Sequence, residues 1–123
     1  MEKKTLTFKT DKQDLVKIGG IDEVASGTIN YINAQFTLGE EWTRFESVSA
    51  VWQTEDDMET TVLDSEGKCN VPDRLLADVG EVKVNLFGSV TQDDIVIGRL
   101  TSYPILAIKV TAKASTDSSL EES

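Results

Sequence analysis

The sequence contains no histidine and only one cysteine. Without histidine there is no histidine-based catalytic triad, no Cys–His pair, and none of the commonest transition-metal ligand. A single cysteine also excludes an internal disulfide framework, so packing must hold the fold together. We therefore expect a protein that is not an enzyme, with no catalytic residues, no cofactor and no metal site.

Basic residues and long apolar runs are also scarce. Lys and Arg number 12 against 22 Asp and Glu, which gives a formal net charge of −10. Binding to nucleic acid or to an anionic membrane surface needs a basic footprint. No apolar run approaches the roughly 20 residues of a transmembrane helix, and the N-terminal MEKKTLTFKT lacks the apolar core of a signal peptide. We expect neither nucleic acid nor membrane as a partner, and no classical secretion.

Short segments in which apolar and polar residues alternate fill most of the chain. Such alternation is the period of a half-buried strand. Leu6 and Phe8 share one face of the first segment, and no helical period persists for even three turns. Further candidate strands lie at 15–18, 27–38, 46–54, 60–64, 81–90, 93–102 and 103–113. Turn signals separate them, so the pattern predicts an all-β fold, an antiparallel β-sandwich of about seven to nine short strands.

Three details of these strands are specific enough to test. In the segment 27–38 the apolar face switches sides around Tyr31–Ile32, which indicates a bulge or a change of sheet. In the last segment one face is predicted to carry Leu106, Ile108 and Val110. The clearest inward faces are those of Val48, Ala50 and Trp52 and of Val82, Val84 and Leu86.

The chain is long enough for one domain, and its character changes near the C-terminus. With 123 residues, of which 39% are hydrophobic, it can bury roughly two-thirds of its unfolded surface. After Val110 the residues become small and polar and end in an acidic stretch. We interpret 1–111 as a β-sandwich domain and 112–123 as a polar flexible tail or linker.

The stretch CNVPDRLLADVG, residues 69–80, breaks the strand pattern. Pro72 suits the first turn of a helix, and Asp73 favours the positive end of the helix dipole. Gly80 supplies the permissive backbone on which a helix ends. We therefore predict one short helical segment at 72–79 that caps an open end of the sandwich. Its buried side is expected to consist of Leu75, Leu76 and Val79.

Cys69 stands just before this segment and has two possible roles. A helix start and the neighbouring Lys68 both favour a reactive thiolate. However, no histidine is present to act as a base, and a cysteine in an apolar strand is commonly a small core residue. Both readings stay open, and we expect the buried structural thiol.

Acidic residues gather in a loop at 55–59 and at Asp93–Asp94. Calcium binds carboxylates in loops, but neither stretch has the spacing of an EF-hand. A carboxylate pair for glycoside hydrolysis is a further alternative. With 22 acids in the chain, two at a useful distance carry little information. Solvated turns are the expected reading.

The two tryptophans differ in context. Trp52 alternates with core residues and is expected inside the protein. Trp42, in the turn GEEWTRF, fits a core plug and an interface anchor equally well.

Several short motifs follow one another in a characteristic order. They are Trp42 and Trp52; Cys69, Val71, Pro72, Leu75 and Leu76; Gly80; Val82, Val84, Leu86 and Gly88; and Arg99, Leu100, Thr101 and Ser102. In their order and spacing these residues make 5–111 resemble the N-terminal domain of upper baseplate (tail adaptor) proteins of tailed phages of Gram-positive bacteria.

This resemblance implies a structural protein of the virion. In that family the β-sandwich docks on the tail hub, and a C-terminal extension carries receptor-binding proteins, whereas this chain stops after a short tail. The implied partners are the hub protein, a receptor-binding protein and further copies of the chain, at the distal tail of a virion made in the bacterial host cytoplasm. The alternative is a carbohydrate-binding β-sandwich that uses Trp42 or Tyr103 as an exposed aromatic platform.

Overall fold

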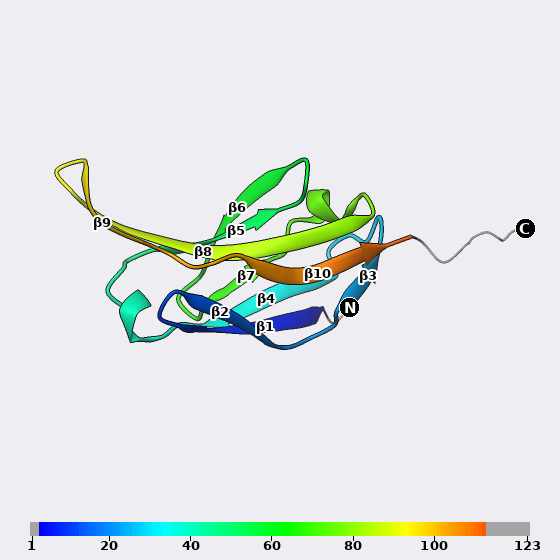
Figure 1. Ribbon diagram of the computed structural model, residues 1–123, viewed down its shortest axis with the longest axis horizontal. Helices are drawn as coiled ribbons and strands as arrows, with labels where there is room; N and C mark the ends of the chain where they lie inside the picture. Colours follow the sequence, from blue (N-terminus) through cyan, green and yellow to red (C-terminus); the bar gives the residue numbers. More distant parts are fainter. Residues whose placement is uncertain (1–2, 113–123) are drawn as a thin grey trace, which may run out of the picture.

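The computed structural model describes residues 3–112 and is all-β. In these residues ten strands form two sheets, which lie one over the other in Figure 1, and the only helical segments are two single 3₁₀ turns. The sequence-based prediction of a β-sandwich is confirmed. No helix in the described range has the length and apolarity needed to cross a membrane. The predicted tail 112–123, except for its first residue, lies outside the described residues.

The smaller sheet has four strands in the order β2-β1-β4-β7. β1 and β2 form a hairpin, β4 runs parallel to β1, and β7 pairs antiparallel with β4. The bounds are β1 Lys4–Asp11, β2 Asp14–Gly19, β4 Ile32–Thr37 and β7 Lys68–Asn70.

The larger sheet has six strands, with β8 at its centre. Its order is β3-β10-β8-β5-β6, and β9 pairs with the distal half of β8. β10 and β9 follow each other along β8, opposite residues 80–84 and 87–92 respectively. The bounds are β3 Glu23–Ala25, β5 Val48–Gln53, β6 Met58–Val62, β8 Gly80–Gln92, β9 Ile95–Thr101 and β10 Ile105–Thr111.

Two strand pairs are parallel, which the expected antiparallel arrangement did not include. They are β1 with β4 and β3 with β10. After the β1–β2 hairpin the chain crosses to the larger sheet for β3 and then returns to the open side of β1. A connection of this length allows parallel pairing, which a two-residue hairpin does not.

The inner faces of the two sheets form one core. Phe8 stacks on Phe36 with ring centroids 4.8 Å apart, and Phe36 meets Trp52 edge-on at 6.3 Å. The inward faces predicted for β1, β5 and β8 are all buried. The largest fully buried side chains are Trp42, Trp52, Phe8, Phe36, Leu6, Ile32, Leu76, Leu86, Ile108, Val82 and Val84.

The predicted helical segment 72–79 is shorter than expected. Only the 3₁₀ turn η2, Asp73–Leu76, forms, and its two leucines are buried as predicted. The prediction was wrong for Val79, which is exposed, and for Gly80, which opens β8 instead of ending a helix. Residues 77–79 form bends instead of a second helical turn, and β8 begins directly after them at Gly80.

Two predicted strand faces also differ from the structure. The register shifts between Leu106 and Ile108, so Ala107 and Ile108 are both buried while Leu106 is exposed. A bulge of this kind moves a side chain to the opposite face. The predicted switch of the apolar face near residue 31 falls in the connection between β3 and β4: residues 26–31 lie outside the strands, Asn30 has a φ of 54°, and β4 begins at Ile32.

Candidate functional site

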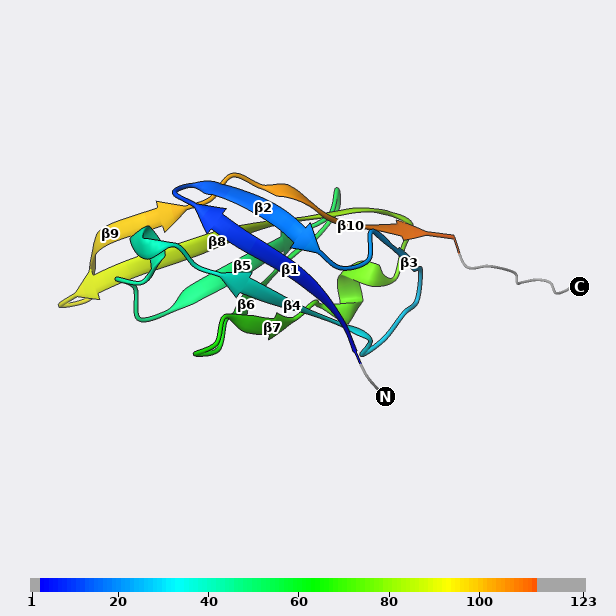
Figure 2. The ribbon, with the colours of Figure 1, turned by 90° about the horizontal axis from the view of Figure 1, so that it is seen from below.

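β8 and β9 continue beyond the sandwich as a two-stranded hairpin. β5 accompanies β8 only as far as Gly88, and from there to Gln92 the partner of β8 is β9. Figures 1 and 2 show the hairpin projecting at the end of the molecule opposite the end of β10. We call residues 89–100 the hairpin arm. Within the described residues, the outer edge of β9 has no strand partner.

The tip of the arm is a tight turn made of Asp93 and Asp94. Gln92 pairs with Ile95, so the loop contains two residues, with φ values of 51° and 64°. Positive φ at both positions defines the type I′ turn, whose twist matches that of the flanking strands. This finding agrees with the solvated-turn interpretation. In the range 3–112 no group of three potential ligands is placed to hold a metal ion.

The arm exposes three consecutive apolar residues. Ile95, Val96 and Ile97 have exposed fractions of 65%, 48% and 59%. Ile95 and Val96 pair with successive residues of β8 and point to opposite faces, so both faces of the arm are apolar near its tip, whereas the register shift between Val90 and Thr91 leaves Ile97 as an extra residue of β9. A single exposed apolar residue is ordinary, but a run on an unpaired edge is a typical contact surface. The sequence predicted a strand here but not this exposed apolar surface. The signal that could have indicated the surface was the unbroken run of three apolar residues, 95–97, which departs from alternation.

The base of the arm is held by packing. A Cβ on Gly88 would lie 3.0 Å from Cγ of Phe45, so the loop before β5 packs directly against the strand. The guanidinium of Arg99 lies 5.4 Å from the ring centroid of Phe87. The arm is therefore rooted in the core while its tip remains in solvent.

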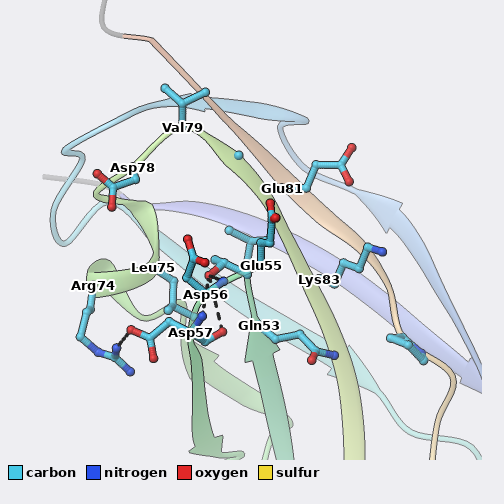
Figure 3. A pocket seen from close by; sticks show the side chains of 14 residues that line it. Gln53, Glu55, Asp56, Asp57, Arg74, Leu75, Asp78, Val79, Glu81 and Lys83 are labelled. Atoms are coloured by element: carbon cyan, nitrogen blue, oxygen red, sulfur yellow. Dashed lines mark hydrogen bonds and ion pairs between the residues drawn. The ribbon is translucent and has the colours of Figure 1, made fainter.

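A hollow with a volume of about 800 Å³ lies at the other end of the sandwich. It is bounded by the β5–β6 loop, the segment after η2 and the start of β8 (Figure 3). No aromatic side chain lines it, so it lacks a stacking platform for a sugar. Its charged lining consists of Glu55, Asp56, Asp57, Asp78, Glu81, Arg74 and Lys83.

Part of this acidic lining has a structural role. Arg74 of η2 forms ion pairs with Asp57 and with Glu59, and it donates a hydrogen bond to the carbonyl oxygen of Met58 at 3.1 Å. These contacts tie the β5–β6 loop to η2. Exposed ion pairs of this kind contribute little to stability, so their effect is to position the loop.

The structure places both tryptophans in the core. Trp52 is fully buried, as predicted, and its indole donates to Oγ1 of Thr61 at 2.9 Å. Of the two readings of Trp42, the core plug is the observed one: it ends the 3₁₀ turn η1, Glu40–Trp42, and donates to the carbonyl oxygen of Lys12 at 2.8 Å. The alternative in which Trp42 is an exposed platform for a sugar was therefore wrong. Tyr103 is 63% exposed.

Cys69 lies in β7 and is half-buried, less so than expected. Burial raises the pKa of its thiol, and the negative charge of Asp64 adds to this effect. The reactive thiolate is therefore disfavoured at neutral pH. This environment fits the structural reading of the residue.

We expect Cys69 to react slowly with a thiol reagent in the folded protein. Its labelling at neutral pH should be at least about tenfold slower than in the denatured chain, because burial and the raised pKa both reduce accessible thiolate. Stopped-flow absorbance measures both rates. The control is Met58→Cys in a Cys69→Ala background, since position 58 is exposed. Equal rates for Cys69 in folded and denatured protein would contradict the structural reading.

The motif series quoted from the sequence can be placed on the elements of the fold. These motifs run through β5, β7, η2, β8 and β9, and they end at Ser102, whose hydroxyl accepts a hydrogen bond from the backbone N–H of Leu86 at 2.7 Å. Comparison of the whole chain with known proteins finds no family model, no curated protein and no solved structure that matches.

Proposed function

We propose that this chain is a non-catalytic structural module that works by protein–protein contact, with the hairpin arm as its docking element. The observation that supports this proposal is the apolar run on the arm. The hydrophobic core does not include these residues, so they do not stabilise the folded monomer by burial. Apolar surface on a projecting strand whose outer edge has no partner within the described residues gives another protein both side-chain contacts and free backbone hydrogen-bonding groups.

The motif resemblance suggests the setting of this contact. We propose that the chain belongs to a phage baseplate, docks on the tail hub at the distal end of the virion, and helps to position receptor-binding proteins. The last motif of the series begins with Arg99 and Leu100 at the base of the arm, and it continues through Thr101, the end of β9, to Ser102. Only this last motif of the series reaches the arm.

A carbohydrate-binding module is the second candidate, and exposed Tyr103 is the observation that favours it. With Trp42 buried, Tyr103 is the one that remains of the two proposed platforms. Binding to glycans should then fall after Tyr103→Ala. The absence of aromatic residues from the hollow at the other end of the sandwich makes this the weaker candidate.

Immunogold electron microscopy tests the baseplate proposal. An antibody to this chain is applied to particles from the source phage or an induced prophage. We expect label at the distal tail. Intact particles without label, in a lysate where the chain is abundant, would overturn the baseplate proposal and bring the glycan-binding candidate forward.

A further inference from the structure

We propose that the hairpin arm docks tip first, by side-chain contact, in an apolar cleft of the hub protein that carries lysine or arginine side chains at its far end. The inference rests on the proposed function, because it describes the partner surface that receives the docking element. It goes beyond that function in stating how the arm enters and which charge the partner carries. The features of the arm that support it are an irregular outer edge, two apolar faces and an acidic tip.

The outer edge of β9 is poorly suited to receive a further strand. The register shift between Val90 and Thr91 leaves Ile97 as an extra residue of β9, and a bulge of this kind interrupts a hydrogen-bond ladder. At the base of the arm, the carbonyl oxygen of Thr101 already accepts a hydrogen bond from Nε2 of Gln13 at 3.1 Å. Regular pairing along this edge is therefore limited to a few residues, and side chains supply most of the contact.

The apolar residues behind the tip cover both faces of the arm. Ile95 and Val96 lie opposite Gln92 and Thr91 of β8, point to opposite faces and are both exposed. A flat partner surface covers only one of these faces. Burying both of them requires apolar walls on two sides of the arm, so the partner surface that fits is a cleft.

The apolar run and the acidic turn are too close together to be separated on docking. Asp94 directly precedes Ile95, and Ile97 follows Asp94 by only three residues, roughly 10 Å at the usual rise of a strand. A cleft that encloses the apolar run on both sides therefore also removes water from the two carboxylates of the tip.

The arm itself offers these carboxylates no cation. Within residues 3–112 neither Asp93 nor Asp94 forms an ion pair, and Arg99, the basic residue of the arm, has its guanidinium over the ring of Phe87. A carboxylate that loses its water without gaining a partner is strongly unfavourable. The partner must therefore supply the cations, and lysine and arginine side chains form the strong hydrogen bonds with carboxylates that this requires.

The acidic tip also disfavours a second copy of this chain as the occupant. Two copies would bring together two net charges of −10, and like charges repel. A basic surface on the hub is attracted instead, and this attraction speeds the encounter of the two proteins at low salt.

Neutralising the tip tests the charge of the partner. The tip variant Asp93→Asn/Asp94→Asn removes both charges and keeps the turn, because asparagine readily adopts a positive φ, as Asn30 does with 54°. The probe is tails purified from particles assembled without this chain, and biolayer interferometry measures their binding to the immobilised chain. We expect the tip variant to bind at least about tenfold more weakly, with an affinity that depends less on salt concentration.

The matched control is the loop variant Glu55→Gln/Asp56→Asn. It changes the net charge by the same amount, and both positions are exposed and lie at the end of the sandwich opposite the arm. We expect it to bind within about twofold of the unmodified chain, because exposed charges are largely screened beyond about 10 Å at 0.1 M salt.

Two results would overturn the inference and leave the proposed function standing, provided that Ile95→Thr/Val96→Thr/Ile97→Thr abolishes binding. One is full binding by the tip variant, which would indicate an apolar site without cations. The other is equal weakening of the tip and loop variants, which would indicate long-range attraction only. If the unmodified chain does not bind tails, or if the triple threonine variant binds them as well as the unmodified chain, the proposed function fails together with this inference.

Discussion

Replacing Trp42 with alanine should lower the free energy of unfolding by about 3–5 kcal/mol, the usual range for removing a large buried aromatic. Trp42 is fully buried and packs near Phe45, with ring centroids 6.4 Å apart. Its indole N–H also satisfies the carbonyl oxygen of Lys12, which links η1 to the β1–β2 turn. The substitution removes this bond and leaves a cavity beside the base of the hairpin arm.

Urea denaturation measures this effect, because Trp52 remains as a fluorescent reporter in the core. Domains of this size have total stabilities of about 5–15 kcal/mol, so the variant should be close to its folding threshold. The control is Tyr103→Ala, which removes an exposed aromatic and should change stability by no more than about 0.5 kcal/mol. If Trp42→Ala were as mild as Tyr103→Ala, the core assignment of Trp42 would be wrong.

Gly67→Ala should destabilise the protein by about 2–5 kcal/mol, combining the costs of a positive φ and of overpacking. Gly67 has a φ of 80°, and a Cβ there would lie 2.3 Å from the carbonyl oxygen of Phe36. Phe36 belongs to β4, and this strand cannot move away from Gly67 without breaking the hydrogen bond that the N–H of Phe36 donates to the carbonyl oxygen of Gly67 at 2.8 Å. The turn itself is fixed by Asp64, whose pKa is lowered by hydrogen bonds from the backbone N–H groups of Lys68 and Glu66.

Gly98→Ala is the matched control for Gly67→Ala. Gly98 does not have a positive φ, and the nearest atom to an added Cβ is Cβ of Val90 at 3.9 Å, an ordinary contact. This variant should be neutral or slightly stabilising, because alanine reduces the freedom of the unfolded chain. Thermal denaturation followed by circular dichroism compares the two. Similar melting temperatures for both glycine variants would contradict the close approach of Gly67 to β4.

Alternation in the sequence was sufficient to predict which face of a strand is buried. Leu6 and Phe8 point inward, as do Val82 and Leu86, because a sandwich buries one face of each strand and period 2 fixes that face. The pattern carries no information about which strand lies alongside or in which direction. The parallel pairing of β1 with β4 therefore could not be predicted, and a bulge such as the one before Ile108 shifts the face without a clear sequence signal.

The position of Trp42 and the existence of the hairpin arm depend on tertiary contacts. Trp42 lies in a loop, where only its contacts with Phe45 and the β1–β2 turn decide whether it is buried. The IVI run was predicted as a strand. However, the arm exists because β8 extends beyond the end of β5, and this can be seen only when the register of the two strands is known.

Most residues of the motif series lie in the core. Val71, Leu75 and Leu76, together with the inward residues of β8, are buried, so most of the motif series reports core packing. Core residues specify a fold and say little about a docking surface. The proposal that the chain acts by contact therefore depends on the arm, whose exposed residues 95–97 lie outside the quoted motifs.

The most direct test of this account compares how well two variants are incorporated into virus particles. One carries Ile95→Thr/Val96→Thr/Ile97→Thr in the arm, and the other carries Met58→Thr/Val62→Thr on the exposed face of β6. Quantitative mass spectrometry of purified particles gives the copies of the chain per virion. We predict that the copy number of the arm variant per virion is at least about tenfold lower than that of the unmodified chain, because the substitutions remove a contact hot spot. The copy number of the β6 variant should match that of the unmodified chain. Equal incorporation of a folded arm variant would contradict the account.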